Sequence, residues 1–330
     1  MKQLDDASIL ITGGTGSLGK SLIGHLIAKS NARRVIIFSR DELKQLQLQN
    51  HFGVNPRLRW FLGDIRDLDR LKRALHGVDF VIHAAALKQV DTGEYNPMEF
   101  IKTNVIGSSN LIEACMDTGV RRVVALSTDK ASSPVNLYGA TKLTADKLFI
   151  AANNYSSAYD TSFSVVRYGN VMGSRGSVIP YFISLAKEGK PLPITDKRMT
   201  RFWITLEQAT QFVLDALNSM SGGELYVPKI PSFRLIDLAS AVAPNSAIVE
   251  VGMRPGEKLH EEMVSFDDSR RTIDIGEKFV VSPVMPKSDF IFPEGKMVPD
   301  GFIYRSDTNT QWLGIGELKS FVGDISGQQV

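Results

Sequence analysis

The first half of the chain alternates between short apolar runs and stretches of helical periodicity, and this alternation constrains the fold more than any other feature. The apolar runs are Ser8–Thr12, Arg34–Phe38, Leu58–Leu62, Phe80–His83, Arg122–Leu126 and Phe163–Arg167. Helical spacing of apolar residues lies between them at Leu18–Ala28, Leu43–Gln49 and Phe100–Met116. Strands joined by helices pair in parallel, and strands without polar alternation are buried on both faces. We therefore expect an α/β fold with a doubly wound parallel sheet.

The pattern changes after Tyr168. Gly, Ser and Pro are frequent in Gly169–Pro193, and a helix is predicted at Leu206–Leu217 and a short strand at Glu224–Val227. We expect a smaller, mixed α/β domain that is interleaved with the larger one. The predicted division assigns residues 1–169 and about 205–232 to the larger domain, and about 170–204 and 233–330 to the smaller one.

Composition excludes several kinds of protein. The 330 residues carry a formal net charge of +2, which favours neither a nucleic-acid nor a membrane partner. The first residues, MKQLDDAS, do not resemble a secretory signal, and no apolar run approaches the ~18 residues of a membrane span. The single cysteine, Cys115, excludes an internal disulfide, and the histidines lack metal-ligand spacing. We expect a cytoplasmic protein without a metal site.

A glycine-rich loop, TGGTGSLG, joins the first predicted strand to the first predicted helix. Glycine permits a tight turn and a close approach of the backbone to a ligand, and the N-terminus of the helix attracts a pyrophosphate. The position of the loop after the first strand predicts a Rossmann-type dinucleotide site. Its expected contacts are Gly13, Thr15, Gly16, Ser17, Leu18 and Gly19.

The end of the second predicted strand indicates which dinucleotide is bound. An NAD site usually has an acidic residue there, which binds the ribose 2′-hydroxyl. In this chain Ser39 and Arg40 occupy that corner, and a guanidinium suits a 2′-phosphate. Asp41 follows, and it could instead cap the next helix. We expect NADP, with NAD as the alternative.

Later strand ends carry further expected cofactor contacts. Small residues after the third and fourth strands let a cofactor lie close to the backbone, and His83 is expected to shape the wall of that site. Lys88, on the loop after the fourth strand, faces either the cofactor or a substrate. These further contacts are Asp64, Ile65, Ala84, Ala85, Ala86 and Lys88.

Tyr138 and Lys142 lie four residues apart, so they share one face of a predicted helix. A lysine beside a tyrosine, near an oxidised nicotinamide, lowers the pKa of the phenol from its usual value of about 10. The phenolate can then remove a proton from a substrate hydroxyl while a hydride passes to the cofactor. The pair follows a strand that ends in Ser127-Thr128, which strengthens a redox interpretation.

With these residues the chain resembles the extended short-chain dehydrogenase/reductase superfamily, in which the hydroxyl at the position of Thr128 orients the reacting hydroxyl. The motifs that carry this resemblance are TGGTGSLG, GDIRD and HAAA, together with Thr128, Tyr138 and Lys142. A closer resemblance is to the inverting UDP-N-acetylglucosamine 4,6-dehydratases, which begin pseudaminic acid synthesis in bacteria that glycosylate flagellin. It rests on SRDELK, AALKQVDTGEYNPMEFIKTNVIGSSN, STDKASSPVNLYGATKL, RYGNVMGSRGSVIP, MTRFWIT and RPGEKLHEEM. The resemblance implies NADP, a UDP-sugar substrate and a homo-oligomer, either a dimer or a hexamer.

Asp129 and Lys130 stand just upstream of the tyrosine. Oxidation of a sugar at C4 acidifies the proton on C5, so a base can remove it while an acid protonates the departing 6-hydroxyl. Our hypothesis is that Tyr138 deprotonates the 4-hydroxyl, Lys130 handles the C5 proton, and Asp129 helps to protonate the leaving group. Lys130 must be neutral to act as a base, and we expect burial near Lys142 and nicotinamide to depress its pKa.

The resemblance also implies where the UDP-sugar binds. Paired arginines match a diphosphate, and a carboxylate can bind ribose hydroxyls. Met199 packs either against the uracil or in the core. The expected substrate contacts are Lys88, Glu94, Thr128, Asn170, Ser174, Arg175, Met199, Arg201, Arg254 and Glu257.

Three alternatives stay open. A UDP-sugar 4-epimerase returns the hydride to C4 and needs neither Asp129 nor Lys130. A retaining 4,6-dehydratase commonly carries Asp-Glu where this chain has Asp-Lys. An NADP-sensing regulatory protein would use the same fold without catalysis, and it would tolerate loss of Tyr138 or Lys142.

Overall fold

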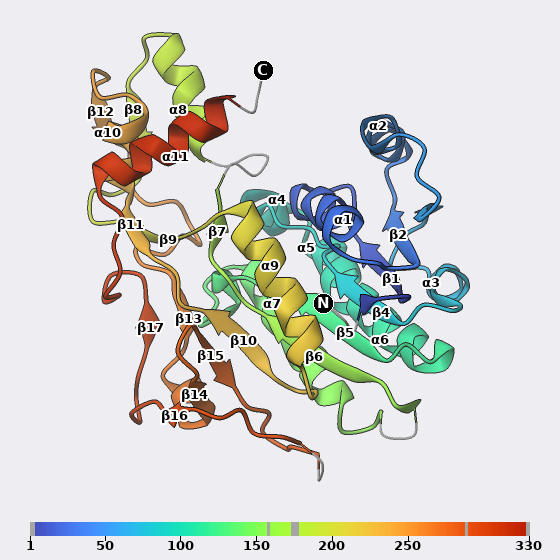
Figure 1. Cartoon of the computed structure of the whole chain (residues 1–330). Coiled ribbons are helices and arrows are strands. Elements are labelled where there is room, and N and C mark those ends of the chain that lie inside the picture. Colours follow the sequence, from blue (N-terminus) through green and yellow to red (C-terminus); the bar gives the residue numbers. More distant parts are fainter. Residues whose placement is uncertain (1–3, 157–158, 173–177, 288–289, 328–330) are drawn as a thin grey trace.

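The computed structural model describes residues 4–156, 159–172, 178–287 and 290–327. A large sheet with helices on both faces forms one part, and a smaller group of strands and helices lies beside the carboxyl ends of its central strands (Figure 1). Within the described ranges, no helix is both long enough and apolar enough to cross a membrane.

Ten strands of the described chain form the large sheet, in the order β16-β14-β15-β10-β6-β5-β4-β1-β2-β3. The parallel strands are β1 (Ser8–Thr12), β2 (Arg34–Ser39), β3 (Leu58–Leu62), β4 (Phe80–His83), β5 (Arg122–Leu126), β6 (Ser162–Val166) and β10 (Leu225–Pro228). The antiparallel additions are β14 (Thr272–Asp274), β15 (Lys278–Val281) and β16 (Lys296–Met297). All five residues of β1 are buried, as the absence of polar alternation predicts.

Helices cover both faces of the sheet. On one face, α1 (Ser17–Lys29) packs against α9 (Leu206–Ser219), and the Thr205–Gln208 capping box begins α9 (Figure 1). The other face is covered by α3 (Leu68–Leu75), α6 (Gly107–Thr118) and α7 (Leu137–Ala152). The remaining helices of this part are α2 (Glu42–Phe52), α4 (Val90–Tyr95), α5 (Pro97–Phe100) and the π-helical turn η2 (Ile101–Ile106).

The smaller part has its own core, in which Trp203 packs edge-on against Phe233 and also contacts the ring of Phe321. Its sheets consist of β7 (Asn170–Val171), β9 (Thr200–Ile204) and β11 (Ser232–Arg234), of β8 (Leu192–Ile194) with β12 (Ile248–Glu250), and of β13 (Glu262–Val264) with β17 (Tyr304–Arg305). Its helices are α8 (Val178–Lys187), α10 (Leu235–Val242) and α11 (Ile315–Gly327).

The predicted α/β class with a doubly wound parallel sheet is confirmed, and all six strands predicted in the first half occur with ends that differ by at most one residue. The predicted helix Phe100–Met116 is a π-helical turn continued by α6. The strands β14, β15 and β16 extend the large sheet, although the predicted division assigned residues 233–330 to the smaller domain. The division into two domains stays a prediction.

Candidate functional site

A cavity of about 1260 Å³ lies at the carboxyl ends of the parallel strands, between the two parts of the molecule. Parallel α/β sheets bind ligands at this end. The predicted site residues that line the cavity are Gly13, Thr15, Gly16, Ser17, Leu18, Gly19, Ser39, Arg40, Ile65, Ala84, Ala85, Ala86, Lys88, Thr128, Lys130, Tyr138, Lys142, Asn170, Met199, Arg201, Arg254 and Glu257. Of the other predicted residues, Asp64, Glu94 and Asp129 lie outside this lining, and Ser174 and Arg175 fall outside the described residues.

The glycine loop has a geometry that only glycine satisfies. Gly13 has a φ of +65°, and a Cβ atom there would lie 2.8 Å from backbone atoms of Ala84 and Ala85. A Cβ atom on Gly19 would lie 2.3 Å from the carbonyl oxygen of Gly14. The loop therefore brings bare backbone and the N-terminus of α1 to the cavity wall. This arrangement fits a dinucleotide phosphate.

At one end of the cavity, Arg40 and Lys44 present two cations. Asp41 caps α2, because its carboxylate accepts the backbone N–H of Lys44 at 2.9 Å, so this alternative for Asp41 is confirmed. Asp64 lies behind this corner and forms ion pairs with Arg66 at 2.7 Å and with Arg40 at 3.5 Å. Asp64 is thus an ion-pair partner of Arg40, the residue predicted to bind the 2′-phosphate.

His83 lies outside the residues that line the cavity, so it does not form part of the wall, contrary to expectation. Its imidazole is buried, and its Nδ1 forms a 2.7 Å hydrogen bond with the hydroxyl of Thr12. Burial, assisted by the charge of Lys142, lowers the pKa of His83 to about 3. The neutral ring therefore supports the strand ends and carries no charge for catalysis.

Tyr138 and Lys142 lie in the first turns of α7, which begins at Asn136 because the Asn136 side chain accepts the N–H of Gly139 at 2.8 Å. Burial raises the pKa of Tyr138 to about 12, and the side chains of Lys130 and Thr128 oppose this effect. Burial also lowers the pKa of Lys142. In the protein alone, desolvation outweighs the nearby cation, which is Lys130 rather than Lys142. The predicted lowering of the Tyr138 pKa requires an oxidised nicotinamide beside the ring, and it stays a prediction.

Asp129 and Lys130 form a short 3-10 turn, η3 (Asp129–Ala131), directly after β5. Asp129 is fully buried, and its Oδ1 accepts hydrogen bonds from the Thr128 hydroxyl at 2.9 Å and from Lys130 Nζ at 3.1 Å. Burial raises the pKa of Asp129, although Lys130 opposes it. The neutral carboxyl form of Asp129 is therefore favoured relative to an exposed aspartate.

The charged groups around Lys130 differ from those that the sequence suggested. Burial alone would lower the pKa of Lys130, but the carboxylates of Asp129 and Glu261 outweigh burial and raise it. The Glu261 contact is an ion pair of 3.3 Å between Nζ and Oε1. In the protein alone the pKa of Lys130 is therefore raised, because Glu261, which the sequence does not place beside it, adds a second carboxylate. The predicted depression depends also on an oxidised nicotinamide, and it stays a prediction.

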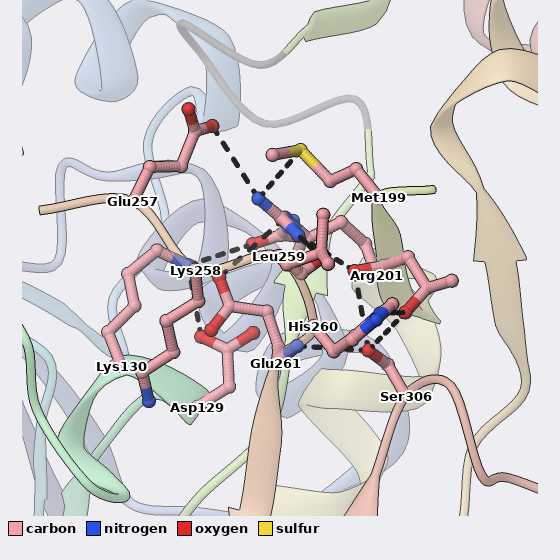
Figure 2. A network of polar contacts seen from close by, with 12 residues as sticks. Asp129, Lys130, Met199, Arg201, Glu257, Lys258, Leu259, His260, Glu261 and Ser306 are labelled. Carbon is pink, nitrogen blue, oxygen red and sulfur yellow. Dashed lines mark hydrogen bonds and ion pairs between the residues drawn. The ribbon is translucent and has the colours of Figure 1, made fainter. Parts of the chain in front are cut away.

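Figure 2 shows the network around this contact, in which Glu261 lies between Lys130 and Arg201. Arg201 is 7% exposed, and it donates hydrogen bonds to the carbonyl oxygens of Thr200 at 2.8 Å and Leu259 at 3.1 Å. Its guanidinium lies 3.5 Å from Glu257. Arg201 is therefore a rigid part of the cavity wall.

Three other predicted substrate residues lie in different settings, two of them at the cavity and one outside it. Asn170 lies in β7 with its amide oxygen 3.4 Å from Lys130 Nζ. Met199 is 1% exposed within the core of the smaller part and also lines the cavity. Glu94 accepts the backbone N–H of Leu137 at 2.9 Å, so it supports the start of α7.

Sequence reasoning missed Glu261 and Lys258, which both line the cavity. Both lie in the motif RPGEKLHEEM, of which the sequence predicts only Arg254 and Glu257 as substrate contacts. Glu261 could have been predicted as a site residue, because it is acidic and belongs to a motif that already supplies two predicted contacts.

The large parallel sheet, the glycine loop and the buried tyrosine–lysine pair define an extended short-chain dehydrogenase/reductase. The family described as polysaccharide biosynthesis proteins matches residues 9–283. The chain belongs to this family.

Two relatives of known name match nearly the whole chain. The chain is 52% identical to "UDP-N-acetylglucosamine 4,6-dehydratase (inverting)" of Campylobacter jejuni, over 97% of this chain and 98% of that protein. It is 42% identical to "UDP-glucose 4-epimerase" of Rickettsia canadensis, over 96% of this chain and 95% of that protein.

Solved structures share the fold. The protein Pen from Bacillus thuringiensis superimposes with a TM-score of 0.90 at 37% identity, and the match covers 98% of each chain. DesIV, a dTDP-glucose 4,6-dehydratase from Streptomyces venezuelae with NAD and TYD bound, superimposes with a TM-score of 0.68 at 27% identity. That match covers 76% of this chain and 86% of DesIV.

Proposed function

We propose that this protein is an NADP-dependent UDP-N-acetylglucosamine 4,6-dehydratase that inverts C5 and yields UDP-2-acetamido-2,6-dideoxy-β-L-arabino-hex-4-ulose. One observation carries the proposal: an Asp129–Lys130 pair lies beside Tyr138 at the cavity, in a chain 52% identical over 97% of its length to an enzyme of that name. A simple alcohol oxidation needs only Tyr138 and Lys142, so an additional acid–base pair supports an elimination.

The first step is oxidation at C4. Thr128 orients the 4-hydroxyl and Tyr138 removes its proton, with Lys142 beside it. A nicotinamide bound at the glycine loop would supply the hydride acceptor for C4 and the hydride donor for C6. The resulting ketone makes the C5 proton acidic, which prepares the elimination.

The elimination needs a neutral amine and a protonated carboxyl together. Transfer of one proton from the Lys130 ammonium to Asp129, over the 3.1 Å hydrogen bond, produces both forms at once. The amine then takes the C5 proton while the Asp129 carboxyl protonates the departing 6-hydroxyl. Water leaves, and the ammonium and carboxylate are regenerated. Return of the hydride to C6 leaves an enolate. Its C5 takes a solvent-exchangeable proton on the opposite face, which balances the proton that Tyr138 took from the 4-hydroxyl and inverts that centre.

The cofactor proposal rests on the loop and on the corner after β2. Gly13 and the uncapped start of α1 suit a pyrophosphate, and Ser39 with Arg40 stands where an NAD site usually has an acid. Lys44 adds a second cation at this corner. These residues favour NADP over NAD.

The wider setting is also proposed. Residues 1–169 with about 205–232 bind NADP, and about 170–204 with 233–330 bind the UDP-sugar through Asn170, Arg201, Arg254 and Glu257. Lys88 of the NADP-binding part adds a contact to the sugar. The protein works in the cytoplasm as a homo-oligomer, and it begins the synthesis of pseudaminic acid for flagellin or surface glycosylation.

One incubation tests the reaction. The protein, UDP-N-acetylglucosamine and NADP are combined in heavy water, and the product is analysed by mass spectrometry and NMR. We expect loss of one water, deuterium at C5 and the inverted configuration there. Lys130→Ala and Lys130→Glu are expected to lose the inverted product. Normal formation of that product by either variant would disprove the role of Lys130.

The second candidate is a UDP-sugar 4-epimerase, which the 42% identity to the Rickettsia canadensis protein of that name favours. An epimerase yields a product of unchanged mass without exchange at C5. The same incubation therefore separates the two reactions.

A further inference from the structure

Glu261 is a buried carboxylate that the catalytic scheme above does not use. Its side chain is 2% exposed, it lies immediately before β13, and it lines the cavity. Its Oε1 lies 3.3 Å from Lys130 Nζ and 3.6 Å from Arg201 Nε. Its Oε2 is buried without a hydrogen-bond partner in the described structure. Burial of such a carboxylate lowers the stability of the fold unless nearby cations compensate for the lost hydration. For Glu261 these cations are Lys130 and Arg201.

The backbone of Glu261 is held in place. Its N–H donates to the hydroxyl of Ser306 at 2.9 Å, and its carbonyl oxygen accepts the N–H of Ser306 at 2.8 Å. The Ser306 hydroxyl also forms a 2.7 Å hydrogen bond with that of Thr200. The neighbouring Glu262 points instead to the catalytic loop, where it accepts from the hydroxyls of Ser132 and Ser133, both at 2.7 Å. The carboxylate of Glu261 is therefore presented to Lys130 from a rigid segment.

The amine of Lys130 is thereby placed between two buried carboxylates. Asp129 lies at 3.1 Å and belongs to the same turn, whereas Glu261 approaches from the other part of the molecule. Without Glu261, a flexible four-carbon side chain would have one anionic partner and freedom to rotate away from it. The other titratable or charged groups that face Lys130 are Arg201, Lys258 and Tyr138.

We propose that Glu261 is a positioning residue for the C5 proton step: its carboxylate fixes Lys130 against Asp129 and keeps on this pair the proton that the elimination uses. The identity of the step rests on the proposed function, whereas the effect on Lys130 does not. Glu261→Gln keeps the size of the side chain and removes its charge. The Asp129–Lys130 pair then loses its proton at a lower pH, because one of two carboxylates that hold it is gone.

The first test measures Lys130 directly and needs no substrate. The ε-carbons of the lysines are labelled with ¹³C, the Lys130 signal is assigned by its loss in Lys130→Met, and the signal is followed by NMR as the pH rises. In the wild type we expect Lys130 to stay charged while the protein remains folded. In Glu261→Gln we expect Lys130 to lose its charge at a pH at which the variant is still folded, because one of its two carboxylate partners is gone. An unchanged titration overturns the proposal.

Glu262→Gln is the matched control. It removes a charge from the adjacent residue, and the amide oxygen can still accept from the two serine hydroxyls. We expect its Lys130 titration to match the wild type. An equal shift in both variants would show a general effect of negative charge on this segment, and the proposal would be wrong.

The second test separates positioning from general damage. In a single turnover, formation of reduced nicotinamide reports C4 oxidation, and release of the dehydrated sugar reports elimination. Glu261→Gln is expected to slow elimination by about 100-fold, the lower range for acid–base catalysis, and to leave C4 oxidation near the wild-type rate. An equal loss in both steps would indicate only a structural role.

Glu261→Asp keeps the negative charge but shortens the side chain by one methylene, which moves the carboxylate away from Lys130. This variant replaces Glu261→Gln in the test if the glutamine variant does not fold. We expect wild-type charge on Lys130 but slower elimination. Wild-type behaviour in both respects would overturn the proposal. If the wild-type protein makes no dehydrated sugar, the proposed function fails, while the NMR titration still decides whether Glu261 holds Lys130.

Discussion

Replacement of Lys130 by methionine should destabilise the protein in a pH-dependent manner. The substitution keeps the length of the side chain and removes the cation between Asp129 and Glu261, whose side chains are 0% and 2% exposed. Two buried carboxylates are then left without their shared partner at 3.1 and 3.3 Å. Removal of one member of a buried ion pair costs about 3–5 kcal/mol. Because Lys130 is itself 25% exposed, we expect the lower end, about 3 kcal/mol near pH 8.

The sign of the pH dependence follows from the carboxylates. In the wild type, burial tends to raise the pKa of Glu261, but Lys130 and the other cations outweigh burial and lower it. In Lys130→Met that compensation is reduced, so the folded-state pKa of Glu261 rises above its unfolded value of about 4, and that of Asp129, which is already raised, rises further. A raised folded-state pKa contributes stability at low pH that is lost as the pH rises. The difference from the wild type should therefore grow from pH 5 to its full value of about 3 kcal/mol near pH 8.

Urea unfolding at both pH values measures this difference. Lys190→Met is the matched control, because Lys190 pairs with Glu188 at 2.7 Å while both side chains are at least half exposed. The control should change the free energy of unfolding by less than about 0.5 kcal/mol at either pH. A destabilisation of Lys130→Met that is equal at pH 5 and pH 8, or no larger than that of the control, would refute the reasoning.

Three further predictions concern other parts of the structure. Gly13→Ala should cost about 1–2 kcal/mol for the left-handed backbone alone and should weaken dinucleotide binding, as measured by calorimetric titration of the cofactor. Arg40→Glu should weaken NADP binding more than NAD binding, and equal losses for both cofactors in the same titration would argue against a 2′-phosphate contact. Asp146→Asn should lower the free energy of unfolding by about 3–5 kcal/mol, because Asp146 pairs at 3.1 Å with Arg167 and both are 3% exposed; urea unfolding checks this value.

The central strands could be predicted because strands buried on both faces consist of consecutive apolar residues. The cap of α2 could likewise be anticipated, since Asp41 acts on a backbone group only three residues away. The strands β14 and β15 escaped prediction, because each has three or four residues and its partner is distant in the sequence. Short strands carry too few residues for a clear period.

The tyrosine, the lysines and Asp129 could be found as candidates from their spacing, but their protonation could not. The pKa of Lys130 depends on Glu261, which is 131 residues away in the sequence and 3.3 Å away in space. A local pattern contains no information on such a contact. The pKa of Tyr138 likewise depends on burial by the folded chain.

The order of strands in the large sheet has a consequence for synthesis of the protein. The outer side of β10 is covered only when β15 arrives, from Lys278–Val281. Until then, a nascent chain has the apolar strand LYVP as a free edge, which is the kind of edge that promotes aggregation. The finished sheet ends instead at β16, a two-residue strand that carries Lys296. Chains truncated before Lys278 are therefore the ones that should depend most on chaperones.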